Sequence, residues 1–81
     1  MITASQLRAA RALLGIGQRA LAEAAGLSLP TIQRMEASDG NVRGNVDSVI
    51  KLIGALENAG VELIPEGAIS QGGGRGVRLK Q

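Results

Sequence analysis

Apolar residues recur every three or four positions through most of the first 60 residues, which is the spacing of amphipathic helices. The first repeat consists of Leu7, Ala10 and Leu14. Thr3 precedes it, and Gln6 stands three residues after Thr3, as in a capping box. The pattern therefore predicts a first helix that begins after Thr3 and ends at Gly15.

Two shorter helices are predicted between Gln18 and Ala37, joined by a glycine turn. Their inner faces consist of Leu21, Ala22 and Ala25 in the first and of Ile32 and Met35 in the second. Gly26 suits the turn because glycine adopts a positive φ without strain. Ser28 is a favoured N-cap residue for the second of these helices, and Pro30 is tolerated in a first helical turn.

The longest periodic segment follows Asn45, a favoured N-cap residue, and ends at Gly60. Its predicted buried stripe consists of Val46, Val49, Ile50, Ile53 and Leu56. Leu52 falls outside this stripe, so we expect this helix to carry apolar groups on two sides.

After Gly60 the period changes from helical to alternating, which predicts two short β-strands. The alternating residues are Val61, Glu62, Leu63 and Ile64 in one strand and Val77, Arg78, Leu79 and Lys80 in the other. The connection, residues 65–76, is rich in glycine and too long for a tight hairpin loop. An isolated two-stranded ribbon is marginally stable in water, so we expect it to dock on the helices or to pair with strands of a partner chain.

Composition narrows the chemistry that the chain can perform. The chain contains no cysteine, histidine or aromatic residue, which excludes disulfides, the usual zinc sites and aromatic stacking on exposed bases. No spacing gathers a carboxylate pair, a lysine or an activated hydroxyl for catalysis. The glycine run at residues 72–76 lacks the lysine and the helix that follow a phosphate loop. We therefore expect no enzyme activity, no cofactor and no metal.

Charge is distributed unevenly along the chain. The net charge is +2, and residues 1–45 and 66–81 each carry +2 whereas residues 46–65 carry −2. The middle segment is therefore the least suited to face phosphate. No apolar run approaches the ~18 residues that span a bilayer, and no basic region followed by an apolar stretch opens the sequence, so we expect a cytoplasmic protein that does not bind membranes.

The stretch at residues 18–36, QRALAEAAGLSLPTIQRME, resembles the helix-turn-helix of the phage repressor and Cro family, the Xre-type regulators. The matching features are Gln18, the Leu21-Ala22 pair, Ala25-Gly26, Ser28 and the ending Ile32, Met35, Glu36. The resemblance covers about residues 2–60 and implies a mainly α, four- to five-helix lambda-repressor-like bundle with a C-terminal two-stranded β extension. We assign residues 1–60 to a DNA-binding domain. Residues 61–81, whose strand pair resembles an extension seen in a subset of such regulators and lies outside the common fold, form a C-terminal extension that is a candidate dimerisation element.

The family places the second helix of the motif in the major groove of double-stranded DNA. Carried onto this chain, the resemblance nominates Gln18, Arg19, Ser28, Leu29, Pro30, Thr31, Gln33, Arg34, Arg43 and Asn45 as DNA-binding residues. Arg34 is suited to guanine and Gln33 to adenine, because each side chain can make two hydrogen bonds to a base edge. The alternative for Arg19, Arg34, Arg43 and Asn45 is ordinary polar surface, and for Thr31 it is a neutral position on the helix surface. Ser28 is alternatively a helix cap alone.

The chain departs from the family pattern in two places, and one of the matching residues, Glu36, needs a charged partner. Many family members have hydrogen-bonding side chains at the positions of Leu29 and Pro30. Base readout here is therefore expected to depend on Gln33, Arg34 and DNA shape. Gly17 replaces the usual Ser or Thr cap of the second helix. Glu36 opposes the dipole at the end of its helix unless an arginine such as Arg11 pairs with it.

The sequence supports two functional hypotheses. The first is a DNA-binding transcriptional regulator, a repressor or autoregulator, that acts as a homodimer on near-palindromic sites. The second is a protein-interaction module, such as an antitoxin or adaptor, that binds a protein partner with its fourth helix and C-terminal strands.

Overall fold

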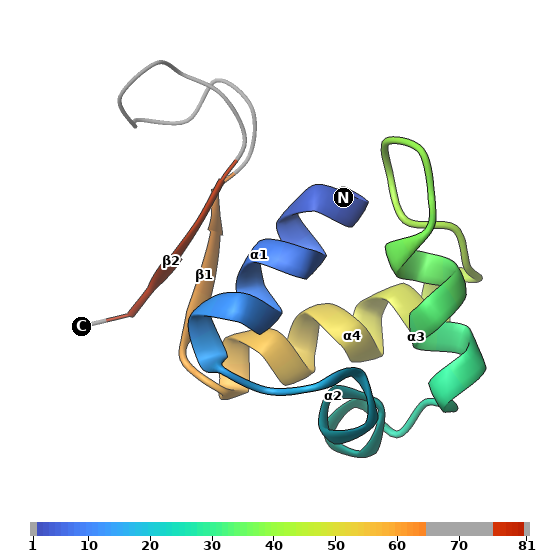
Figure 1. Ribbon diagram of the computed structural model, residues 1–81, viewed down its shortest axis with the longest axis horizontal. Coiled ribbons are helices and arrows are strands. Elements are labelled where there is room, and N and C mark those ends of the chain that lie inside the picture. The colour runs from blue at the N-terminus through green and yellow to red at the C-terminus, as the bar shows by residue number, and fades with distance from the viewer. Residues whose placement is uncertain (1, 65–75, 81) are drawn as a thin grey trace.

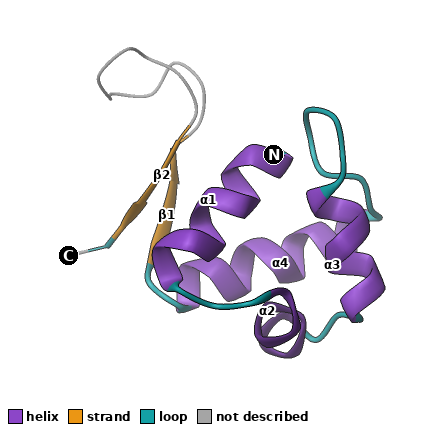
Figure 2. Ribbon diagram, in the orientation of Figure 1, coloured by secondary structure: helices purple, strands orange, loops and turns teal. Residues whose placement is uncertain are grey.

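The computed structural model describes residues 2–64 and 76–80 of the chain. In this part of the chain, the elements are α1 (Ala4–Leu14), α2 (Gln18–Ala25), α3 (Leu29–Glu36), α4 (Val46–Asn58), β1 (Val61–Ile64) and β2 (Gly76–Leu79). Figure 1 shows α4 crossing the middle of the molecule, from α3 at one end to the β-ribbon at the other. Figure 2 shows that helices dominate, so the expected mainly α bundle with a two-stranded extension is confirmed.

Short-range signals define the ends of the helices. Thr3 and Gln6 form the predicted capping box at α1, and Gly15 ends that helix in the left-handed conformation, with a φ of 66°. The Oγ of Ser28 accepts a hydrogen bond from the backbone N–H of Thr31, which caps α3. The Oδ1 of Asn45 accepts from the backbone N–H of Ser48 at 2.8 Å, which caps α4. These caps satisfy amides that would otherwise lack a partner in the first turn of each helix.

The helices share one apolar core. Its largest fully buried side chains are Ile2, Leu7, Leu21, Ile32, Met35, Leu52, Leu56 and Val61. They come from the N-terminal segment, from every described helix and from β1. Burial of these side chains is the main favourable contribution to folding, because it removes apolar surface from water.

One expectation about α4 is wrong. Leu52 is fully buried, together with Val49 and Leu56, whereas Val46 and Ile50 are 66% and 59% exposed. The helix does have apolar groups on two sides, but Leu52 lies in the core and the outer side begins at Val46. The reason is that two overlapping stripes fit the sequence, and packing against the core selects the one centred on Leu52.

The β-ribbon docks on the chain's own helices. β1 and β2 pair antiparallel, with Val61 opposite Leu79 and Leu63 opposite Val77. Gln6 of α1 donates hydrogen bonds from its Nε2 to the carbonyl oxygens of Ile64 and Gly76, both at 3.1 Å. The docking anticipated for the ribbon is therefore confirmed. Of the predicted glycine-rich connection, residues 65–75 lie outside the described residues.

Among the described residues, no helix has both the length and the apolar character that crossing a membrane requires.

Candidate nucleic-acid interface

The turn between α2 and α3 fixes the relative position of these two helices. Gly26 adopts a φ of 68°, and its backbone N–H donates to the carbonyl of Ala22. The N–H of Leu27 donates to the same carbonyl at 2.9 Å. Leu21 of α2 and Ile32 of α3 are both buried in the shared core. The turn and the core together hold α3 by its inner face, as the helix-turn-helix pattern predicts.

The outer face of α3 carries polar side chains that are linked to one another. Ser28 and Thr31 share a hydrogen bond between their hydroxyl oxygens at 2.8 Å. The guanidinium of Arg34 donates from Nη2 to the Thr31 hydroxyl at 3.3 Å. Pro30, Gln33 and Arg34 are exposed, whereas Leu29 and Thr31 are partly buried. The Thr31 hydroxyl, which is itself hydrogen-bonded to the N-cap residue Ser28, therefore orients the Arg34 side chain along the exposed face.

Ser38, which sequence reasoning did not single out, connects α3 to the loop that follows it. Its Oγ donates to the Arg34 carbonyl at 3.1 Å and accepts from the backbone N–H of Arg43 at 2.9 Å. This bridge ties exposed Arg43 to the end of α3. A serine just after a helix is typical of such side chain to backbone hydrogen bonds, but the sequence does not reveal the second partner.

The other nominated residues flank α3. Arg19 lies exposed in the first turn of α2, and Asn45 lies exposed at the start of α4. Gln18 is partly buried, and its Nε2 donates to Oε1 of Glu36 at 3.1 Å. This amide is therefore engaged inside the protein, and its role as a phosphate contact stays a prediction. Gly17 is the N-cap residue of α2, and no side chain caps the first turn of this helix, as the glycine at this position predicts.

Glu36 is a buried carboxylate at the end of α3, and only 7% of it is exposed. Its Oε2 lies 2.7 Å from Nε of Arg11, and its Oε1 accepts from Nη2 of Arg11 at 3.0 Å, so the predicted pairing is confirmed. The Arg8 guanidinium donates to the Glu36 carbonyl oxygen. These contacts join α1 and α2 to the end of α3 and thereby hold the exposed helix in place.

The charges around Glu36 set its protonation state. Burial alone would raise the pKa of Glu36, but hydrogen bonds from Arg11 and Gln18 and the charges of Arg11 and Arg8 outweigh it and lower the pKa. The hydrogen bond to Glu36 raises the pKa of Arg11, in spite of partial burial. The pair is therefore ionised at neutral pH.

The helix-turn-helix family model matches residues 7–57, which runs from α1 almost to the end of α4. The chain is an Xre/Cro-like helix-turn-helix protein. Proteins of this family bind DNA and are typically not enzymes. Among curated proteins, none matches the chain closely enough to count as a relative.

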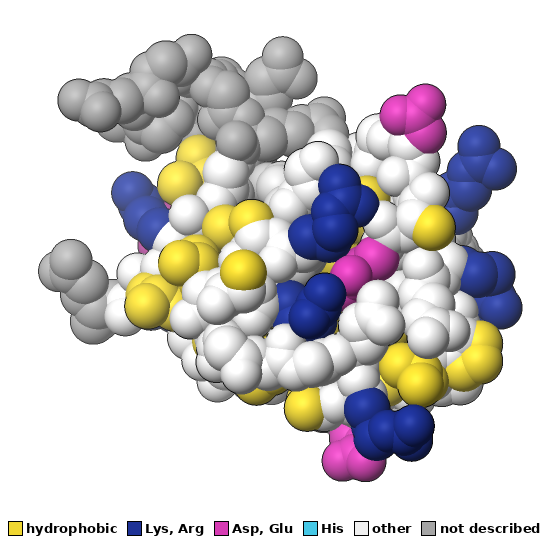
Figure 3. Space-filling model, in the orientation of Figure 1, with side chains coloured by type: hydrophobic (Ala, Val, Ile, Leu, Met, Phe, Trp, Pro, Cys, Tyr) yellow, Lys and Arg dark blue, Asp and Glu magenta, His cyan; other side chains and the backbone are white. Residues whose placement is uncertain are grey.

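Basic side chains of this helix-turn-helix protein border the exposed helix. Figure 3 shows Lys and Arg side chains along the edge formed by α3 and the loop after it. At the centre of the same view, an acidic side chain lies between basic ones. Exposed acidic residues, Asp39 in the same loop and Glu23 in α2, interrupt this edge. The exposed arginines Arg19, Arg34 and Arg43 are the groups there that suit a phosphate-facing surface.

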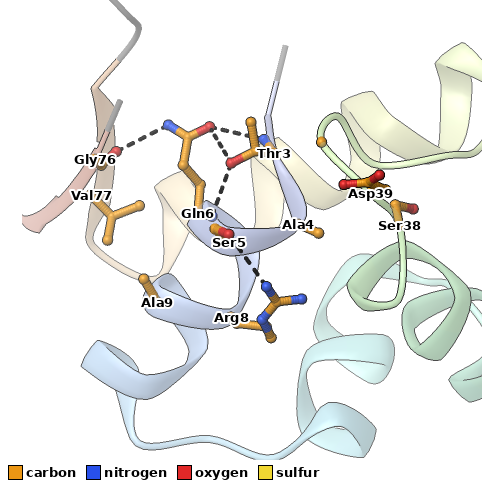
Figure 4. A pocket seen from close by; sticks show the side chains of 11 residues that line it. Thr3, Ala4, Ser5, Gln6, Arg8, Ala9, Ser38, Asp39, Gly76 and Val77 are labelled. Atoms are coloured by element: carbon orange, nitrogen blue, oxygen red, sulfur yellow. Dashed lines mark hydrogen bonds between the residues drawn. The ribbon is translucent and has the colours of Figure 1, made fainter. Parts of the chain in front are cut away.

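A hollow of about 470 Å³ lies away from the outer face of α3. Figure 4 shows it between α1, the loop at Ser38 and Asp39, and the start of β2. The polar groups of Gln6 already bond to Thr3 and Gly76, and Arg8 bonds to Ser5. These hydrogen bonds join the surrounding elements, and no residue of α3 lines the hollow.

Proposed function

We propose that this helix-turn-helix protein is a sequence-specific transcriptional regulator of double-stranded DNA, a repressor or autoregulator, that reads the major groove with α3 as a homodimer. The observation that carries the proposal is the outer face of α3, where Gln33 and Arg34 are exposed while Ile32 and Met35 are buried. A helix held by its inner face and polar on its outer face suits the width of the major groove.

The residues from Ser28 to Arg34 that do not lie in the core have distinct roles in this proposal. Arg34 donates two hydrogen bonds to the O6 and N7 of one guanine, and Gln33 contacts an adenine by the same geometry. Leu29 and Pro30 offer apolar contact to thymine methyl groups. Ser28 and Thr31 position the Arg34 side chain through the hydroxyl chain on this face.

The flanking residues contact phosphate and so fix the position of α3 on the duplex. Arg19, Arg43, Asn45 and the first turn of α2 at Gln18 supply these contacts. Because such contacts release counterions, binding should weaken steeply as salt rises. Complete lack of duplex binding at low salt would instead favour the antitoxin or adaptor hypothesis, for which the exposed Val46 and Ile50 provide an apolar surface.

Arg34→Ala is expected to weaken binding to the preferred site by ~1–3 kcal/mol, which is about 5- to 150-fold, and to relax the preference at one base pair. The matched control is Arg19→Ala, which removes an exposed arginine proposed to contact phosphate. It should weaken binding to all sequences alike. Electrophoretic mobility shifts on a panel of single-base variants measure both effects. Equal loss on every sequence with Arg34→Ala would contradict the assignment of base readout to this residue.

A further inference from the structure

The outer side of α4 carries apolar residues that the fold does not use. Val46 and Ile50 lie one helical turn apart and are among the most exposed large apolar residues described. Gly54 stands one further turn along the same ridge. A Cβ built on Gly54 meets nothing within 4 Å, so packing within the chain does not require glycine there. Glycine inside a helix costs stability relative to alanine, whereas the close approach of a second helix would favour it.

One acidic and one basic residue border this ridge, so that the same surface on a second copy can offer each of them the opposite charge. Asp47 and Lys51 are exposed and follow Val46 and Ile50 directly in sequence. If two copies of α4 pack antiparallel through their outer sides, with the two-fold axis midway between Asp47 and Lys51 along the helix, Asp47 faces the partner's Lys51 on each side of that axis. The same arrangement interdigitates Ile50 with the partner's Val46. Parallel packing would place like charges together, so antiparallel pairing is favoured.

We propose that Val46, Asp47, Ile50 and Lys51, called here the α4 face, bind a second copy of this chain through antiparallel packing of α4 against α4. This inference names the surface of the homodimer and in that sense rests on the proposed function. The contact is isologous: Asp47 meets the partner's Lys51 and Lys51 meets the partner's Asp47, which is the reciprocal pattern of a two-fold dimer.

The edge of β2 is less suited to a second copy. Arg78 and Lys80 lie at β2 and next to it, and β2 contains no acidic residue. In the antiparallel register that sets Val77 opposite the partner's Leu79, Arg78 would face the partner's Arg78, and like charges directly opposite destabilise a sheet. In this structure Arg78 instead pairs with Glu62 of β1 at 2.6 Å. A basic edge strand is a common protection against edge-to-edge association.

The α4 face is small, because each copy offers only two large aliphatic side chains. A contact of this size supports a weak, concentration-dependent dimer rather than a permanent one. Two copies that meet on neighbouring half-sites of DNA gain a high effective concentration. The proposed dimer should therefore bind a two-half-site duplex cooperatively.

The test is sedimentation equilibrium of the full chain with Ile50→Lys and with Leu13→Lys. Leu13 is a matched control, because it is also an apolar helix residue exposed at 44%. Ile50→Lys is expected to raise the dimer dissociation constant at least about tenfold, because it puts two unpaired charges in the contact, while Leu13→Lys leaves it within about twofold. Circular dichroism melting identifies a variant that fails to fold.

Charge exchange provides a second, independent test. Asp47→Lys and Lys51→Asp should each weaken the dimer about fivefold, and the double variant should return it to within about twofold of the original. An additive loss in the double variant, or a wild-type chain that stays monomeric both free and on a two-half-site duplex, would overturn the inference.

The outcome for DNA binding is measured separately. Monomeric Ile50→Lys should still bind a single half-site with unchanged affinity and lose only cooperativity. If the chain dimerises through the α4 face but binds no duplex, the proposed function fails while the inference stands. If it binds half-sites without any dimer, the inference fails while α3 keeps its role.

Discussion

Leu52→Ala is expected to lower the free energy of unfolding by about 2–5 kcal/mol, enough to leave a domain of this size partly unfolded at room temperature. Leu52 is fully buried in the core, so truncation removes apolar contacts and leaves a cavity. Urea denaturation followed by circular dichroism measures the change.

The matched control is Val46→Ala on the same helix. Val46 is mostly exposed, so its truncation should change the free energy of unfolding by no more than ~0.5 kcal/mol in dilute solution. The two substitutions distinguish the observed packing of α4, with Leu52 in the core, from an alternative in which the stripe that begins at Val46 faces the core. A large loss with Val46→Ala and a small one with Leu52→Ala would show that α4 is rotated from its described position.

Arg11→Met is expected to lower the free energy of unfolding by about 3 kcal/mol near neutral pH, because it leaves the buried Glu36 carboxylate without its main partner. Methionine keeps most of the apolar stem of the side chain, so the loss reports on the charge. Arg19→Met, at an exposed arginine, is the control and should cost less than ~0.5 kcal/mol.

The effect of Arg11→Met depends on pH in a defined direction. In the native protein the pKa of Glu36 is lowered, so the stabilisation from the pair is present above the ordinary carboxyl pKa and is lost as the pH falls through the lowered value. In the variant this stabilisation is absent at every pH, because the hydrogen bond and the charge of Arg11 are removed. The difference between the proteins should therefore shrink towards about pH 4. If Arg11→Met lowers the free energy of unfolding by the same amount near neutral pH and at about pH 4, an ionic role for the pair is contradicted.

Most of the secondary structure could be predicted from the sequence because its signals are local. Thr3, Ser28 and Asn45 each cap a helix through a hydrogen bond to a residue three positions on. Gly15 and Gly26 end helices in the left-handed conformation that glycine adopts without strain. Signals of this kind need no knowledge of the rest of the chain.

The side of α4 that faces the core could not be predicted in the same way. Two overlapping stripes satisfy the helical period, and only packing against the other elements decides between them. The bridge from Ser38 to Arg43 and the hydrogen bond from Gln18 to Glu36 also depend on where separate elements meet. The exposed face of α3 was recognisable because its inner residues, Ile32 and Met35, and its polar outer residues alternate within one short helix.

The most direct test of the central proposal, that α3 reads the major groove, is methylation interference on a duplex selected from random sequences by the purified protein. Methylation of guanine N7 modifies the major groove, and methylation of adenine N3 modifies the minor groove. We expect N7 methylation of a guanine in each half-site to block binding, and one such guanine to lose its effect in Arg34→Ala. Interference confined to adenine N3, or selection that yields no preferred sequence, would contradict it.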